Sequence, residues 1–225
     1  MKTIGYTGAF CALLSWASST AALPFNDVIT GADMAGIQVT AFFNGASESA
    51  TWATTSTDDS LPSGEGFAGQ ATGSGWSLAQ QGYTLGNFDG GPLGAWTLTN
   101  NTGFNIFSLR IDALIADILF DRYIDEEYTP GSNVGRDFLT DGSVDATGSY
   151  SDAFSSPDLF GTLTIDFANG LADGASMQFL ADTDAIASVP APATLLLVAA
   201  GCLGLGWSAR SGRSAAASQQ LGYTS

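Results

Sequence analysis

The residues of this chain that could do chemistry are almost all carboxylates. All 22 Asp and Glu residues lie between Asp27 and Asp184, the chain has no His, and its two cysteines, Cys11 and Cys202, lie in apolar segments near the ends. Without His, the commonest general base and the commonest transition-metal ligand are missing. No lysine follows Lys2, so the usual serine nucleophiles are excluded as well. The groups that remain are carboxylate oxygens, which can bind hard cations or act in pairs on a sugar.

Asp182 and Asp184 in the FLADTD segment are the first candidates for a calcium site, with Asp121 or Asp112 from another strand end as a third ligand. Ca²⁺ takes carboxylate and carbonyl oxygens, and weak calcium sites fill outside the cell. A second, weaker option is the DGSVD segment at 141–145. None of these spacings is that of an EF-hand loop. The alternative is that the same residues form solvated Asp turns at strand ends. We expect no cofactor other than a structural Ca²⁺.

No motif in the chain indicates catalysis. The sequence contains neither a GxSxG nucleophile elbow nor a Walker-type phosphate loop. A glycoside-active enzyme needs only two carboxylates, but the sequence marks out no pair. We therefore predict that the protein is not an enzyme. A carbohydrate-binding module is the alternative, and it requires Trp76, Trp96 and Tyr83 to be exposed together on one sheet face, where their rings could stack on sugars.

Short runs of alternating apolar and polar residues dominate the middle of the chain. Such runs, bounded by Gly, Asn, Asp and Pro, indicate half-buried antiparallel strands. In one of them, Phe107, Leu109 and Ile111 are predicted to face the core. About eight to ten such strands predict an all-β fold, an antiparallel two-sheet sandwich or jelly roll. The clearest runs are GIQVTAFF at 36–43, FNIFSLRID at 104–112, GTLTIDF at 161–167 and ASMQF at 175–179, with shorter ones around Trp52, Trp76 and Trp96.

Three other segments have weaker patterns. DALIADILFD at 112–121 follows a strand and contains β-branched residues, so we assign it as strand rather than helix. Residues 56–75 show no periodicity and are predicted to form a long loop. The DEEYTPGS segment at 125–132 is predicted to be an acidic turn.

We take 23–187 as one extracellular domain, and its 22 carboxylates and three arginines give a net charge of −19. Such a charge would repel nucleic acids.

The first 22 residues have the features of a secretory signal peptide. One positive charge at Lys2 is followed by a short apolar stretch and then by small residues before Leu23. This order of a positive region, an apolar region and small residues is typical of secretory signals. We predict that residues 1–22 are removed on export, by cleavage after Ala21 or Ala22.

A second apolar segment, residues 193–209, lies near the C-terminus. It carries no charge, and its length is close to the lower limit for a membrane-spanning helix. Pro190 and Pro192 precede it and prevent a helix from extending backward. Arg210 and Arg213 follow it and would hold that end on the cytoplasmic side. We therefore predict a transmembrane helix at 193–209.

The segment 188–214, with its Val-Pro-Ala-Pro-Ala-Thr motif, Leu-rich span and closing arginines, resembles the PEP-CTERM sorting signal of Gram-negative bacteria. The matching motif positions are Val189, Pro190, Ala191 and Pro192, and Ala191 stands where the family usually has Glu. The resemblance implies recognition and cleavage near the Pro motif by a membrane protease, an exosortase. A short polar tail at 215–225 continues beyond the arginines.

Segments of the middle region are also similar to extracellular β-sandwich modules that precede such tails. They include WTLTNNTG at 96–103, LFD at 119–121, TPGS at 129–132 and FLADTD at 179–184. Together the two resemblances imply a secreted protein that is anchored in the membrane through its C-terminal helix before processing. The implied role is structural or interactive, at the cell surface or in an exopolysaccharide-rich matrix or biofilm, with extracellular polysaccharide as a partner.

Overall fold

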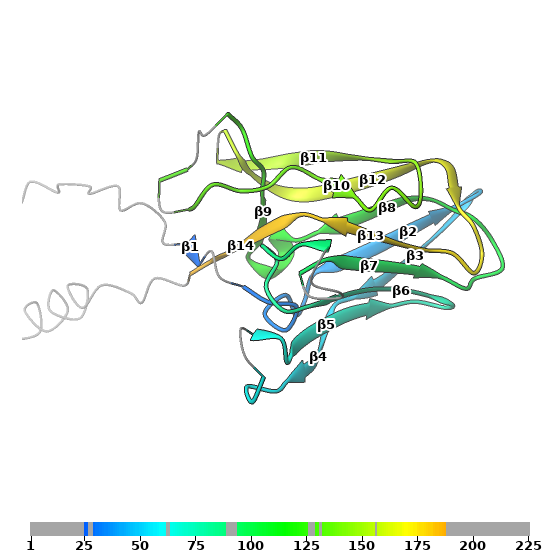
Figure 1. Cartoon of the computed structure of the whole chain (residues 1–225). Helices are drawn as coiled ribbons and strands as arrows, with labels where there is room; N and C mark the ends of the chain where they lie inside the picture. Colours follow the sequence, from blue (N-terminus) through cyan, green and yellow to red (C-terminus); the bar gives the residue numbers. More distant parts are fainter. Residues whose placement is uncertain are drawn as a thin grey trace, which may run out of the picture.

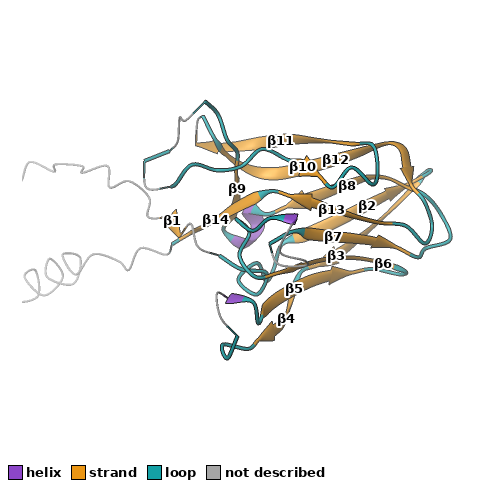
Figure 2. Cartoon of the chain, viewed as in Figure 1, coloured by secondary structure: helices purple, strands orange, loops and turns teal. Residues whose placement is uncertain are grey.

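The alternating runs of the sequence form two antiparallel sheets packed face to face, as the computed structural model in Figure 1 shows. The structure describes residues 25–26, 29–61, 64–88, 94–125, 129–130, 132–155 and 157–187. In these residues strands dominate, and helix is limited to short turns (Figure 2). The predicted all-β sandwich is therefore confirmed. In the described residues we find no helix that is both long enough and apolar enough to cross a bilayer. The predicted signal peptide, sorting segment and transmembrane helix lie outside these residues.

The eight-stranded sheet is organised around its longest strand, β12. Strand β11 pairs with one edge of β12, while β8 and then β9 pair with the other edge. The 3₁₀ turn Leu114–Ala116 separates β8 from β9. Because β8 continues to β2 and β3 while β9 continues to β14 and β1, the sheet divides into two branches. The strands are β1 (Phe25–Asn26), β2 (Gln38–Phe43), β3 (Ala46–Thr51), β8 (Ile106–Asp112), β9 (Ile118–Asp121), β11 (Ala146–Ser155), β12 (Leu159–Leu171) and β14 (Asp182–Ile186).

The six-stranded sheet has the order β10-β13-β7-β6-β5-β4. The chain passes into it from the other sheet at Trp52, whose backbone N–H donates to the Ile37 carbonyl at 2.8 Å and whose indole N–H donates to the Gly31 carbonyl at 2.8 Å. The predicted single strand around Trp52 is thus two strands in different sheets. The strands are β4 (Ala53–Thr57), β5 (Phe67–Thr72), β6 (Trp76–Gln81), β7 (Trp96–Asn100), β10 (Leu139–Thr140) and β13 (Ser176–Leu180).

Tryptophan side chains fill the space between the sheets. Trp96 is completely buried; it stacks on Phe179 with ring centres 5.7 Å apart and meets Trp52 edge-on at 5.3 Å. Trp76 is only 2 % exposed, whereas Tyr83 is 37 % exposed. The aromatic sugar-binding face that the alternative function requires is therefore not formed by these residues. Trp76 and Trp96 occupy inward positions of β6 and β7, and inward side chains of a sandwich pack against the opposite sheet.

Two weaker predictions are corrected in part by the structure. Residues 56–75 are not one loop, because β5 begins at Phe67; its inward positions hold Gly69 and Ala71, which give no hydrophobic signal. The segment 112–121 starts with the last residue of β8 and continues as a 3₁₀ turn before the short strand β9, so it is strand only at its two ends.

The predicted inward face of β8 is also partly wrong. Ile106 is buried and Phe107 is exposed, although Leu109 and Ile111 face the core as predicted. The cause is a register irregularity in the pairing of β8 with β12. Gly170 lies at positive φ in this part of β12, and the Phe107 ring packs close to it. This irregularity changes which face Phe107 occupies.

The two ends of the described domain lie together. Phe25 in β1 pairs with Ile186 in β14, so the chain enters and leaves at the same end of the sandwich (Figure 1). At the opposite end lie the β2–β3, β5–β6, β7–β8 and β12–β13 turns, which we call the distal tip. The sandwich therefore has one end connected to both terminal segments and one end away from them.

Candidate metal centre

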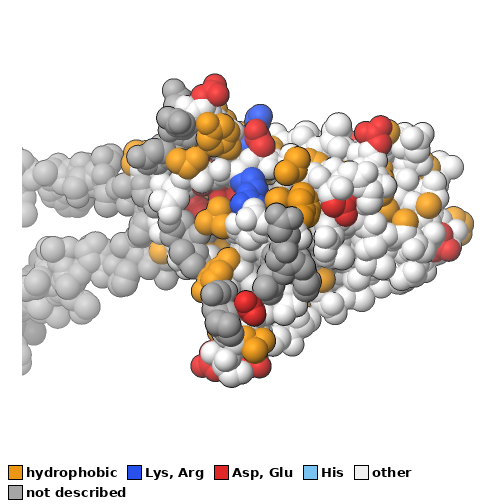
Figure 3. Space-filling view, in the orientation of Figure 1, with side chains coloured by type: hydrophobic (Ala, Val, Ile, Leu, Met, Phe, Trp, Pro, Cys, Tyr) orange, Lys and Arg blue, Asp and Glu red, His pale blue; other side chains and the backbone are white. Residues whose placement is uncertain are grey.

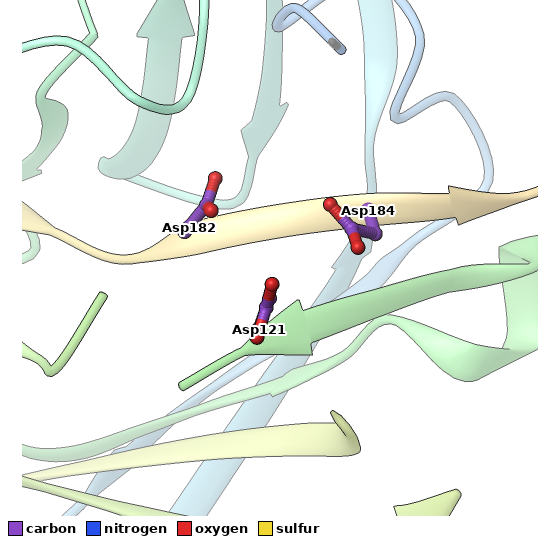
Figure 4. A group of neighbouring side chains, drawn as sticks. All are labelled: Asp121, Asp182 and Asp184. Carbon is purple, nitrogen blue, oxygen red and sulfur yellow. The ribbon is translucent and has the colours of Figure 1, made fainter. Parts of the chain in front are cut away.

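Three aspartates from two neighbouring strands converge near the end where the chain enters and leaves. Asp121 is the last residue of β9 and pairs directly with Asp182, the first residue of β14. Asp184 lies two positions further along β14, and alternate residues of a strand share a face. One oxygen from each carboxylate lies within 4.8 Å of the others. Figure 4 shows the Asp121 side chain pointing toward β14, with the other two carboxylates beside it.

The three carboxylates are almost completely removed from solvent. The exposed fractions are 1 % for Asp121, 3 % for Asp182 and 0 % for Asp184. Like charges directly opposite each other on paired strands are destabilising, and an isolated buried charge is far more costly than a surface one. Among the described residues, no arginine forms an ion pair with Asp121 or Asp182. The cluster therefore needs protons or a cation to be stable.

The Ser132 hydroxyl lies between two of the carboxylates. Its oxygen is 2.9 Å from Oδ2 of Asp121 and 2.5 Å from Oδ2 of Asp184. A hydroxyl carries one hydrogen and can donate to only one acceptor at a time. Ser132 can therefore satisfy only one of these two contacts with its own hydrogen.

The remaining oxygens of the cluster differ in their hydrogen bonding. Oδ1 of Asp182 accepts from the backbone N–H of Thr183 at 2.8 Å and from the Thr84 hydroxyl at 3.1 Å. Oδ1 of Asp121 is buried and accepts no hydrogen bond from the described residues. The backbone of Gly135 packs directly against that atom, so that a Cβ at position 135 would lie 2.3 Å from it. Asp121 therefore has a buried oxygen without a hydrogen-bond partner among the described residues.

Burial shifts two of these carboxylates toward their neutral forms. Burial, opposed by the Ser132 hydrogen bond and reinforced by the charges of Asp184 and Asp182, raises the pKa of Asp121 to about 8. Burial and the neighbouring charge of Asp184 raise the pKa of Asp182 to about 7. The positive charge of Arg136 opposes this rise in the pKa of Asp182. The Arg136 guanidinium itself donates to the backbone carbonyls of Leu85 and Gly86.

The structure thus brings together Asp121, Asp182 and Asp184, the three residues selected from the sequence as calcium ligands; ion binding itself stays a prediction. Asp112 does not join them, because its carboxylate accepts from Arg110 and from the Thr162 hydroxyl. The weaker option at 141–145 is an exposed turn in which the Asp141 carboxylate accepts from Ser143, as the solvated-turn alternative expects. The cluster contains only oxygen donors, which suit Ca²⁺ or Mg²⁺ rather than zinc or copper.

Two partners of the cluster were not found by sequence reasoning. Ser132 lies in the segment predicted to be an acidic turn, and Thr84 follows Tyr83, which pairs with Thr30 in an isolated bridge. No spacing in the sequence links either residue to the three aspartates. Only the packing of their loops against β9 and β14 brings them to the carboxylates.

A second feature, which we call the tip groove, lies at the distal tip. It has a volume of about 680 Å³ and is lined chiefly by Phe43, Phe104, Phe107, Asn44, Asn105 and Glu48. Phe104 is 70 % exposed, and hydrophobic side chains are also visible at this tip in the space-filling view (Figure 3). The Glu48 carboxylate accepts from the backbone N–H of Ser74 and from the Trp76 indole, both at 2.8 Å. The groove is thus aromatic, with amides and one fixed carboxylate at its rim.

The fold and the cluster define a class, an antiparallel β-sandwich with a buried three-carboxylate centre. Comparison of the chain with protein-family models, with curated proteins and with solved structures found no match.

Proposed function

We propose that the protein is a secreted surface or extracellular-matrix component with a structural or interaction role, held in the membrane by its C-terminal segment until an exosortase-type protease processes it. The observation that carries this proposal is the placement of one β-sandwich between a signal-peptide-like start and a PEP-CTERM-like end. In this role the protein displays its domain outside the cell and does not catalyse a reaction.

The arrangement of the two chain ends supports this proposal. Strands β1 and β14 pair at one end of the sandwich, a few residues from the predicted signal cleavage site and from the sorting motif. A domain tethered through that end would present its distal tip away from the membrane. Chain termini often lie close together in single domains, and this arrangement is compatible with tethering.

The burial of the carboxylate cluster supports a non-catalytic role. Two acids that cleave a glycosidic bond must contact the sugar from both sides. Asp121, Asp182 and Asp184 are at most 3 % exposed, so a polysaccharide chain could not reach them. The strong negative charge of the domain favours solubility, and it favours contacts with acidic polymers only through cations.

The test is the intact mass of the protein recovered from its host, in membrane and medium fractions. We expect a released species that begins at Ala22 or Leu23 and ends near Val189–Pro192. Replacing Pro190 and Pro192 by alanine should abolish release and leave the chain in the membrane fraction, whereas Ser218→Ala in the polar tail should not. A membrane-bound species that still carries Tyr223, with no released form, would contradict the proposed sorting.

The tip groove favours a second candidate function, binding of a neutral glycan. Its phenylalanine floor, its amide side chains and its single charged lining residue match the usual make-up of a small-ligand site, apolar walls with a few polar groups. A neutral sugar also avoids repulsion by the acidic domain. The residues differ from those predicted for a carbohydrate-binding module, because Trp76 and Trp96 are in the core.

We expect Phe104→Ala to weaken binding of the full-length chain to neutral exopolysaccharide from its host at least fivefold in a pull-down titration. The thermal unfolding temperature should stay unchanged, because Phe104 is 70 % exposed. Leu139→Ala, at an exposed apolar residue of β10 outside the groove, is the matched control and should bind like the wild type. Equal binding by all three proteins would exclude the groove as the binding site.

A further inference from the structure

We propose that Asp121, Asp182 and Asp184 bind one divalent cation of the calcium type, and that this ion fastens β14, the last strand of the domain, to β9. The proposal does not depend on the sorting pathway or on the tip groove. It names the positive charge that compensates the buried carboxylates and the strand pairing that this charge stabilises.

The spacing of the ligand atoms fits a shared ion. Calcium–oxygen distances are about 2.3–2.6 Å, so two oxygens on opposite sides of one ion lie about 5 Å apart. One oxygen from each of the three aspartates lies within 4.8 Å of the others. A divalent ion bound by the three carboxylates also removes most of the electrostatic repulsion between Asp121 and Asp182, which face each other across the β9–β14 ladder.

A second, independent observation points to a ligand. Oδ1 of Asp121 is buried, accepts no hydrogen bond from the described residues and belongs to a side chain that points toward β14 (Figure 4). Among the described residues, the two hydrogen bonds to the Asp182 carboxylate both go to Oδ1. Buried polar atoms without a protein partner are rare and indicate an ion or a water. The Ser132 hydroxyl, within 2.9 Å of the Asp121 carboxylate, adds a further oxygen at the same place.

The position of the site gives the ion a structural role. Within the described residues, strand β14 pairs only with β9 and with the two-residue strand β1. It is followed directly by the segment that carries the sorting motif. An ion shared by β9 and β14 therefore crosslinks the end of the domain at the point where the C-terminal segment begins. Without the ion, the charges within the β9–β14 ladder repel each other, and β14 should open more readily than the rest of the sheet.

The first experiment measures thermal unfolding of the purified full-length chain in detergent, stripped with EDTA and then titrated with CaCl₂ or MgCl₂ at pH 8. At about one hundred times its Kd, Ca²⁺ should raise Tm by roughly 5–10 °C. Asp121→Asn and Asp182→Asn, which keep side-chain shape, should lose this rise. Asp166→Asn, at an exposed carboxylate on β12 of the same sheet, should keep it. No rise in the wild type, or a rise that persists in both cluster variants, would overturn the proposal.

Two further measurements keep the proposal testable if a variant fails to fold. Tb³⁺ bound in the wild-type site should luminesce on Trp excitation and be displaced by Ca²⁺, because the Trp96 indole donates to the carbonyl of Ala181, the residue before Asp182. Ca²⁺ should also slow hydrogen exchange of the amides of 182–186 at least tenfold more than that of β5. Absence of Tb³⁺ luminescence would exclude the site, and equal slowing of both strands would exclude the fastening of β14.

Discussion

Replacing Trp96 by alanine is expected to destabilise the protein by about 3–5 kcal/mol, the usual cost of truncating a fully buried large aromatic side chain. Trp96 lies where the two sheets meet. It contacts Trp52, Phe120 and Phe179 with ring centres 5.3–6.3 Å apart, and its indole N–H donates to the Ala181 carbonyl at 3.0 Å. The change therefore leaves a cavity and also an unpaired carbonyl group next to β14.

The measurement is urea unfolding at 25 °C followed by circular dichroism. Phe104→Ala is the matched control, because it also removes an aromatic ring but from a residue that is 70 % exposed, and it should change the free energy of unfolding by less than about 0.5 kcal/mol. A loss of under about 1 kcal/mol for Trp96→Ala would contradict the packing described here.

In cation-free buffer, the stability of the protein is expected to fall as the pH rises from about 4 to about 8. Burial raises the pKa of Asp121 to about 8 and that of Asp182 to about 7, above the ordinary aspartate value that both regain on unfolding. At a pH between the ordinary aspartate pKa and these raised pKa values, the folded state holds protons that the unfolded state has released. Raising the pH therefore favours unfolding, by up to about 1.4 kcal/mol per pH unit for each proton held.

The check is a series of urea unfolding curves at pH 5, 6, 7 and 8 in the presence of EDTA. Asp121→Asn removes one titrating group while keeping its shape, so it should make the fall with pH shallower, and Asp166→Asn should not. The other charged groups that face the pair, Asp184, Asp158 and Arg136, are unchanged in both variants. Stability that is flat or that rises over this range would show that the cluster does not hold protons in the ion-free protein.

Much of the secondary structure could be predicted from local pattern. The alternation in GTLTIDF placed Leu163, Ile165 and Phe167 on one buried face, and the structure confirms it. Local pattern was less informative where inward residues are small, as at Gly69 and Ala71 of β5. It also misassigned Phe107, because a register irregularity depends on the partner strand and leaves no trace in the sequence of β8 itself.

The candidate site was predictable only in part. Asp182 and Asp184 lie two positions apart in the sequence and carry the only kind of ligand that this His-free chain offers in quantity. Which third carboxylate joins them could not be derived, since Asp112 and Asp121 both lie at strand ends. The β9–β14 pairing decides it, because it sets Asp121 directly opposite Asp182 while Asp112 faces Thr162 on β12.

The sequence by itself determined the class of fold and the available chemistry, because alternation, turn residues and composition act over a few neighbouring residues or over the chain as a whole. The tertiary structure alone decided that the tryptophans fill the core and that three carboxylates meet with Ser132 in a buried site. Both outcomes depend on which strands become neighbours. That choice is fixed by packing between residues far apart in the chain, which no local pattern records.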